Sequence, residues 1–166
     1  MQCHDPRGSI AIIVANVAET DRPRSIIERL LRDQLLAVLG TRLQDGAPYT
    51  SLVAFAATAE LRHLLFATGR ATRKWFNLVH DARASMLIDS RTNRESDFAE
   101  AAAVTVLGTV EEVGIEEHDA FLEVFLAKHP HLAEFTEAPT CVLLRLVVER
   151  YILVTRFQHV VEIHVE

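Results

Sequence analysis

The chain has 166 residues, about half of them hydrophobic and a quarter charged, with a formal net charge of −6. This length favours one domain over residues 1–166, and the acidic balance argues against a nucleic-acid binder or a protein held on an anionic membrane. The two cysteines, Cys3 and Cys141, form neither a disulfide framework nor a metal-ligand spacing, which fits a reducing, cytoplasmic location.

The N-terminal part is predicted to be a lead-in over residues 1–24 that contains a β-rich run at 10–18. Asn16 interrupts this run and the small-residue cleavage pattern is poor, so an ordinary strand is favoured over a signal peptide. No apolar run approaches the roughly 20 residues of a membrane span. Ser25 and Glu28 have the spacing of a capping box, which predicts a helix over residues 25–34 with Ser25 as its N-cap.

The next segments have the pattern of short strands joined by turns. A buried strand is predicted at 35–42, and Asp45-Gly46 marks a hairpin that leads to a returning strand from Pro48 to Ala57. A third strand is expected at 61–68, followed by a helix at 72–80. The hydrophobic residues of this helix are expected to face the core: Trp75, Phe76, Leu78 and Val79.

The second half of the chain is predicted to be mostly strands. They are expected at 84–89, at 103–113 with Gly108 as a bulge, at 141–148 and 151–155 with a break around Glu149 and Arg150, and at 159–165. A long loop covers 90–101 and a helix covers 116–128. Runs of strands with about three short helices predict a mainly β protein, with a closed antiparallel barrel rather than a doubly wound sheet.

The segment from Phe66 to Phe76 has an unusual charge distribution. Arg70, Arg73 and Lys74 lie at the expected N-terminus of a helix, where the macrodipole already disfavours cations by roughly 0.3–1 kcal/mol each. Such a terminus, with free N–H groups and cations, is suited to bind a phosphate. A solvated basic turn is the alternative interpretation.

Other chemical motifs are weak. The eight histidines form no metal-ligand pattern, and the chain has no GxSxG, GxGxxG or GxxxxGK[ST] sequence. No residue is identified as a general acid or base. The loop at 89–97 is rich in hydrogen-bonding side chains, which is typical of solvated loops and also of ligand or interface loops.

Four sequence blocks between Gly46 and Ile88 resemble the pyridoxamine 5'-phosphate oxidase-like, FMN-binding split-barrel superfamily. In chain order they are Gly46-Ala47-Pro48-Tyr49, Phe66-Ala67-Thr68, Thr72-Arg73-Lys74 and Asp81-Ala82-Arg83-Ala84-Ser85. The resemblance covers residues 35–113 well, is looser over 151–165 and does not extend to residues 1–20. It implies a split antiparallel β-barrel of the Greek-key type with short flanking helices.

The resemblance also implies FMN as cofactor and a homodimer with flavin at the subunit interface. Thr72, Arg73 and Lys74 would hold the flavin phosphate, and the loop at 91–97 would face the partner's flavin. The implied cofactor-binding residues are Ser51, Leu52, Val53, Ala67, Thr68, Thr72, Arg73, Lys74, Arg91 and Asn93.

The chain departs from true pyridoxamine-phosphate oxidases at substrate positions. Ser51 and Ala56 replace an Arg and a Lys of those enzymes, and the basic C-terminal motif is missing, so a second phosphate has no clamp. The favoured function is therefore a flavin-dependent oxidoreductase acting on an unidentified small acceptor. The alternatives are a flavin-binding electron carrier or sensor without turnover, a haem-binding or haem-degrading relative, and a deazaflavin user.

Overall fold

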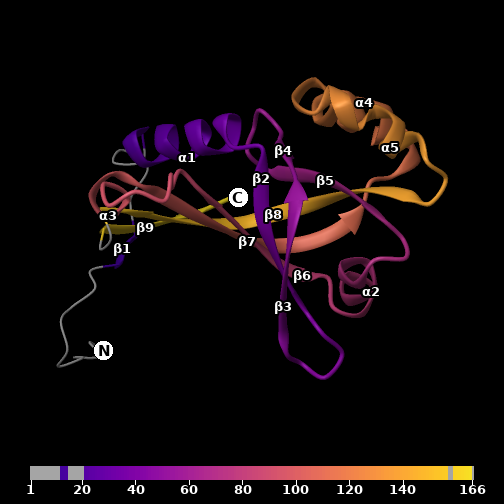
Figure 1. Ribbon diagram of the computed structural model, residues 1–166, viewed down its shortest axis with the longest axis horizontal. Helices are drawn as coiled ribbons and strands as arrows, with labels where there is room; N and C mark the ends of the chain where they lie inside the picture. Colours follow the sequence, from indigo (N-terminus) through magenta and orange to yellow (C-terminus); the bar gives the residue numbers. More distant parts are fainter. Residues whose placement is uncertain (1–11, 15–20, 157–158, 166) are drawn as a thin grey trace.

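The computed structural model describes residues 12–14, 21–156 and 159–165. Figure 1 shows an elongated sheet with helices packed on its outside. The described strands are β1 (Ile12–Val14), β2 (Leu36–Arg42), β3 (Pro48–Ala54), β4 (Ala56–Ala57), β5 (His63–Gly69), β6 (Arg83–Asp89), β7 (Ala102–Glu112), β8 (Cys141–Thr155) and β9 (His159–His164). The described helices are α1 (Asp21–Asp33), α2 (Arg73–His80), α3 (Asp97–Glu100), α4 (Ile115–Lys128), α5 (Ala133–Glu137) and the 3₁₀ turn η2 (Pro130–Leu132).

The strands curl into a split antiparallel β-barrel. Pairing runs in the order β3–β2–β6–β7–β8–β5–β4, and β3 and β4 are the two halves of one segment interrupted at Phe55. The path therefore returns to the segment where it started. Beyond the barrel, β8 pairs with β9, which pairs in parallel with β1. The predicted mainly β fold, with few helices, is confirmed.

The long strands β7 and β8 are the centre of the sheet, and a bulge bends their pairing. Leu107 pairs with Arg150 and Gly108 with Val148, so Glu149 is the extra residue in β8. A Cβ on Gly108 would lie 2.0 Å from the Val147 carbonyl oxygen, which explains the glycine. The predicted bulge at Gly108 is confirmed. The predicted break around Glu149 is wrong, because β8 absorbs the extra residue and continues to Thr155.

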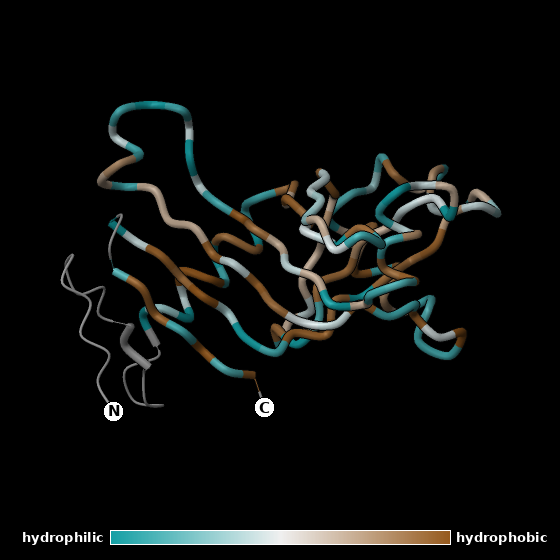
Figure 2. Tube along the Cα trace, turned by 90° about the horizontal axis from the view of Figure 1, so that it is seen from below, coloured by the Kyte–Doolittle hydropathy of each residue, from teal (hydrophilic) through white to brown (hydrophobic). Residues whose placement is uncertain are grey.

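The barrel encloses one large apolar core, and a smaller one lies under α4. Leu39, Phe66, Met86, Val106 and Leu146 are among the residues that are fully buried in the main core. α1 covers this core with Ile27, Leu30 and Leu31, and the smaller core is built around Phe125 of α4. Figure 2 shows the hydrophobic residues along the strands and the hydrophilic ones concentrated in the connections.

The first helix starts earlier than predicted. α1 begins at Asp21, so the lead-in predicted to reach residue 24 ends sooner, and Ser25 is not an N-cap. Its hydroxyl instead donates to the Arg22 carbonyl within the helix, and Glu28 pairs with Arg24 one turn away. Pro23 is tolerated because it lies in the first turn, where its missing N–H has no intrahelical acceptor.

Two further predictions about helices are corrected. In α2, Leu78 is buried and Trp75 packs on the core, but Phe76 is 54% exposed and Val79 is 68% exposed. An eight-residue helix presents only one face to the barrel, and these two side chains lie on the other. The loop predicted at 90–101 contains the short helix α3, and α5 and η2 follow α4 where no helix was predicted.

No helix in the described part of the chain is long and apolar enough to cross a membrane. The predicted strand at 10–18 lies largely outside the described residues, apart from β1.

Candidate functional site

Hydrogen bonds around Thr72 fix the turn between β5 and α2. The Thr72 hydroxyl donates to the Gly69 carbonyl at 2.9 Å and accepts from the Trp75 amide at 3.4 Å, which makes Thr72 the N-cap of α2. The Thr68 and Thr72 hydroxyl oxygens are also 3.0 Å apart. This turn therefore presents the first residues of α2 in one defined orientation.

One of the three cations at this turn is engaged within the chain. Both terminal nitrogens of Arg70 hydrogen-bond the two carboxylate oxygens of Glu112 at the end of β7. The Arg70 guanidinium carbon also lies 4.7 Å from the centre of the Trp75 ring, in a cation–π contact. Because Arg70 has a carboxylate and an aromatic partner, it is not an open anion ligand. The structure therefore leaves two cations available for one phosphate, rather than the three predicted from the sequence.

The other two cations, Arg73 and Lys74, make no hydrogen bond or ion pair with a described side chain. Arg73 is exposed and Lys74 is half-buried. Their backbone amides lie in the first turn of α2, where N–H groups have no intrahelical acceptor, and this turn has no acidic residue. Two unpaired cations and free amide groups are suited to bind an anion, and we call this turn the candidate α2 anion site.

The predicted residues of β3 differ in where their side chains point. Val53 is buried in the barrel core, so only its backbone can face a ligand. Leu52 is 66% exposed on the outer face of the sheet. The Ser51 hydroxyl is buried and has no hydrogen-bond partner among the described residues, which leaves a polar group unsatisfied.

β3 and β5 lie close together, and α2 follows β5 directly. The structure thus brings β3, which carries Ser51, Leu52 and Val53, close to β5, and the C-terminal end of β5 leads to the candidate α2 anion site. Ala67 of β5 is half-buried beside the smaller core, and Thr68 is buried with its hydroxyl engaged by Thr72. β3 pairs only with β2 among the described strands, so one backbone edge of β3 is open.

The predicted residues Arg91 and Asn93 are not brought to this site within one chain. Their loop lies beside α3, at the opposite end of the sheet from α2 (Figure 1). Asp97 orders the loop by accepting from the Thr92 amide and hydroxyl and from the Arg94 amide. Arg91 pairs with Asp89 at 3.1 Å.

A cavity of about 760 Å³ lies under this loop. Its apolar wall includes Leu87, Phe98 and Val154, and its polar rim includes Arg91 and Asn93. The predicted loop residues therefore line an open, largely apolar cavity that is separate from the α2 anion site.

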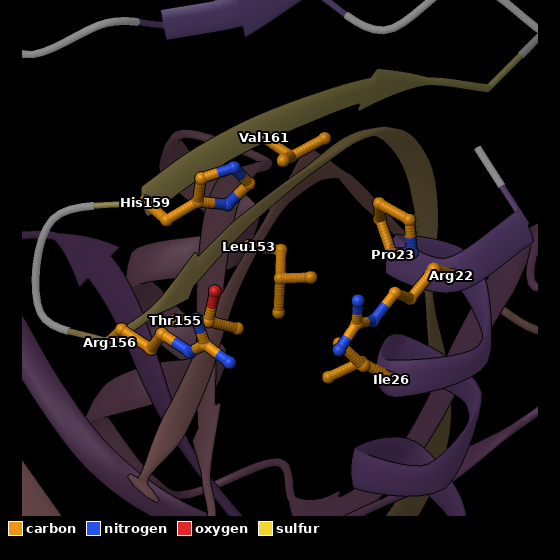
Figure 3. A pocket seen from close by; sticks show the side chains of 8 residues that line it. All are labelled: Arg22, Pro23, Ile26, Leu153, Thr155, Arg156, His159 and Val161. Atoms are coloured by element: carbon orange, nitrogen blue, oxygen red, sulfur yellow. The ribbon is translucent and has the colours of Figure 1, made fainter. Parts of the chain in front are cut away.

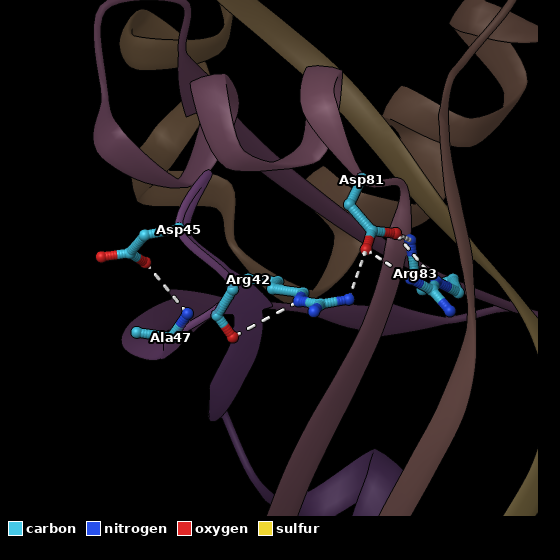
Figure 4. A network of polar contacts seen from close by, with 6 residues as sticks. Arg42, Asp45, Ala47, Asp81 and Arg83 are labelled. Carbon is cyan, nitrogen blue, oxygen red and sulfur yellow. Dashed lines mark hydrogen bonds and ion pairs between the residues drawn. The ribbon is translucent and has the colours of Figure 1, made fainter.

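Asp81 connects the end of α2 to the β2–β3 hairpin (Figure 4). Its carboxylate accepts from the Arg83 side chain at 2.7 and 2.9 Å and lies 3.8 Å from the Arg42 guanidinium, while Arg42 also donates to the Gly46 carbonyl. The hydrogen bonds from Arg83 hold the pKa of Asp81 well below its usual range. Two residues of the Asp81–Ser85 block thus have a structural role near the site.

The histidines that are partly or fully buried have structural partners. His129 is buried and its Nε2 lies 2.8 Å from the Phe55 carbonyl oxygen, and His63 packs on Phe121. Burial lowers the pKa of both residues. No group of His, Cys, Asp or Glu among the described residues can hold a metal ion.

Sequence reasoning missed three features of this region. The pairing of Arg70 with Glu112 joins residues 42 positions apart, and no local pattern signals it. Likewise, Asn77 of α2 is buried and donates to the Thr41 hydroxyl at 3.0 Å. The buried, unpaired state of the Ser51 hydroxyl depends on packing around β3, which only the structure reveals.

Comparison with protein families gives a match over residues 25–155 to a family model described as pyridoxamine 5'-phosphate oxidase. No curated protein matches the chain.

Several solved structures share the fold at low sequence identity. The heme binding protein from Mycobacterium smegmatis is 20% identical with a TM-score of 0.73, over 82% of this chain and 56% of that protein. The FAD-binding protein mll6688 from Mesorhizobium loti is 20% identical with a TM-score of 0.61, over 77% of this chain and 89% of that protein. The heme storage protein HutZ from Vibrio cholerae is 16% identical with a TM-score of 0.62, over 79% of this chain and 92% of that protein.

Proposed function

The chain belongs to the pyridoxamine 5'-phosphate oxidase family, and from this premise we propose that it binds FMN and acts as a flavin-dependent oxidoreductase on a small acceptor. The observation that carries the proposal is the pair of cations at the start of α2. Arg73 and Lys74 have no described partner, whereas Arg70 beside them is held by Glu112. A phosphate dianion fits two cations and the free amides of the first helical turn.

Other residues fit the remainder of an FMN molecule. The unpaired Ser51 hydroxyl is suited to a polar group of a ligand, since an unsatisfied buried polar group costs about 1–3 kcal/mol. The open backbone edge of β3 has N–H and C=O groups that can hydrogen-bond the polar edge of a flat ring system. Val53, Ala67 and Thr68 contribute to this proposed site through their backbone or their packing.

Bound FMN would supply hydride or electron transfer, and the residues of the chain would bind and orient it. Pyridoxamine-phosphate oxidation is not the proposed reaction. Ser51 and Ala56 have no charge to hold a phosphorylated substrate, and Ala56 is buried. The acceptor is instead expected to be a small molecule whose binding does not depend on a phosphate group.

We also propose a homodimer, supported by an apolar row on the outer face of the sheet. Leu52, Val38 and Leu87 are in register across β3, β2 and β6. Leu52 is 66% exposed and Leu87 is 36% exposed, and Leu87 also lines the cavity beside Arg91. Covering this row with a second copy would bring the 89–97 loop of the partner subunit toward the FMN site, which would engage Arg91 and Asn93.

The dimer proposal is tested by Leu52→Lys, with Ile115→Lys as the matched control. Ile115 is 96% exposed at the start of α4, away from the row. The expected result is a monomer with weakened FMN binding for Leu52→Lys and an unchanged dimer for Ile115→Lys, measured by mass in solution. A monomeric native protein would contradict the proposal.

The FMN proposal is tested with the purified native protein. Its absorption spectrum is expected to show flavin bands, with FMN identified by mass after denaturation, or protein isolated without flavin is expected to bind added FMN. A colourless protein that does not bind FMN would refute the proposal. Steady NAD(P)H oxidation would favour the oxidoreductase, and fast one-electron exchange without NAD(P)H oxidation would favour an electron carrier.

A haem-binding function is the second candidate, because two of the structurally similar proteins are named for haem. It predicts a Soret band when haem is added to the protein. Haem binding without FMN binding would replace the main proposal.

A further inference from the structure

A second cavity lies between the start of α1 and the hairpin that joins β8 to β9. It has a volume of about 260 Å³. Figure 3 shows that Arg22 projects into it from α1 and Arg156 from the opposite wall, with Leu153 of β8 between them. The two guanidinium groups therefore face the same small space from separate elements.

The charged side chains that line this cavity are both positive. None of its described lining residues is acidic, and neither Arg22 nor Arg156 has a side-chain partner among the described residues. Arg22 also lies in the first turn of α1, where the helix dipole disfavours a cation. In a chain with a net charge of −6, two unpaired guanidinium groups around one cavity favour an anionic ligand.

Arg156 lies in the turn that follows β8. Its φ is +49°, in the left-handed region that arginine adopts rarely. Asparagine or glycine would fit this position with less strain. A turn between antiparallel strands commonly requires such a conformation, and in it the Arg156 side chain projects into the cavity (Figure 3).

The remaining residues that line the cavity indicate which chemical groups the rest of a ligand would have. Ile26, Leu153 and Val161 provide apolar surface, and Val161 and Leu153 are buried. The Thr155 hydroxyl and the His159 ring add hydrogen-bonding groups on the hairpin side (Figure 3). We propose that this cavity binds a small organic anion, with a phosphate or carboxylate between the two arginines and a short apolar body on Ile26, Leu153 and Val161.

This site is distinct from both regions described above and does not depend on the proposed FMN function. Leu153 and Thr155 line it, whereas Val154 lines the larger cavity under the 89–97 loop. Successive residues of a strand point to opposite faces, so the two cavities lie back to back across β8. The α2 anion site lies at the other end of the sheet (Figure 1).

Calorimetric titration with phenyl phosphate and with inorganic phosphate tests the proposal. The protein carries Arg73→Ala and Lys74→Ala so that the α2 site does not contribute. Phenyl phosphate is expected to bind more tightly than phosphate, because the apolar wall adds contact. In this background, Arg22→Gln with Arg156→Asn is expected to weaken phenyl phosphate binding by about tenfold or more, as loss of charge-assisted hydrogen bonds predicts.

The control variant is Arg29→Gln, which removes an exposed arginine of the same helix that does not line the cavity. It is expected to bind phenyl phosphate like the parent protein. Thermal melting shows whether the double variant remains folded. Asparagine is used at position 156 because it tolerates the left-handed backbone conformation, so Arg156→Asn removes the guanidinium without adding backbone strain. Three results would each overturn the proposal: no binding by the parent, equal binding by the folded double variant, or equal weakening by Arg29→Gln.

Discussion

Removing Arg73 and Lys74 together is the most direct test of the proposed flavin phosphate site. Neither side chain has a described partner, so Arg73→Ala with Lys74→Ala breaks no internal ion pair. Thr72 still caps α2, and losing cations near a helix N-terminus is stabilising by about 0.3–1 kcal/mol each. The ligand-free variant is therefore expected to melt at the same temperature as the native protein or slightly higher.

The loss of FMN affinity can be estimated from the contacts removed. A hydrogen bond to a charged group contributes about 1.5–3 kcal/mol, so two give about 3–6 kcal/mol. Arg73 is exposed, and solvent screening places the expected value near the lower limit. This corresponds to FMN binding weakened by about a hundredfold. Riboflavin has no phosphate, so its affinity is expected to change by less than about twofold.

The assay is a fluorescence titration of both flavins against native and variant protein. Arg70→Gln is the matched control, because Arg70 lies in the same turn but is held by Glu112 and Trp75. It is expected to weaken FMN much less than the double variant. If the double variant loses FMN and riboflavin affinity equally, or if Arg70→Gln has the larger effect, the phosphate assignment is wrong.

Three further predictions concern stability. Gly108→Ala places a Cβ against the Val147 carbonyl oxygen and should destabilise the barrel by about 2 kcal/mol or more in denaturant unfolding, whereas an intact stability would contradict the bulge geometry. Hydrogen bonds from Arg83 lower the pKa of Asp81 from 3.8. Their contribution to the stability of the folded protein is therefore present above this pH and is lost at lower pH. Asp81→Asn should therefore lower the melting temperature at neutral pH, and the difference from native protein should shrink on acidification. Burial lowers the pKa of His129 from 6.5, so the unfolded chain binds more protons and stability falls as pH decreases below this value. His129→Gln should flatten that pH dependence, and an unchanged slope would show that other groups cause it.

Much of the barrel could be predicted because local patterns and tertiary structure agree. The Asp45-Gly46 turn is a strong hairpin signal, and Gly46 has the positive φ of 90° that such a turn requires. The helix capped by Thr72 and the bulge at Gly108 were likewise visible in the sequence. The start of α1 could not be predicted, because the Ser25–Glu28 spacing occurs inside a helix as well as at its N-terminus.

Side-chain partners across the barrel could not be predicted from local spacing. Gly40 is opposite Ser85, and a Cβ at Gly40 would lie 2.6 Å from the Ser85 hydroxyl. This pairing gives a packing reason for the glycine at position 40, opposite the serine that ends the Asp81–Ser85 block. The engagement of Arg70 by Glu112 depends in the same way on which strand ends meet. A sequence pattern can identify the cations of the turn, but only the folded structure separates the paired one from the open ones.

The outer face of β2 provides the strongest structural argument for a second subunit. The apolar run at 35–42 predicts a buried strand, and its inward residues Ala37 and Leu39 are indeed buried in the barrel. Val38 is half-buried and points the other way, between Leu52 and Leu87, which are 66% and 36% exposed. A strand that is apolar on both faces is typical of burial on both faces. We propose that a second copy of the chain covers this face, and the same copy would also supply the loop residues that lie too far from the α2 site within one subunit.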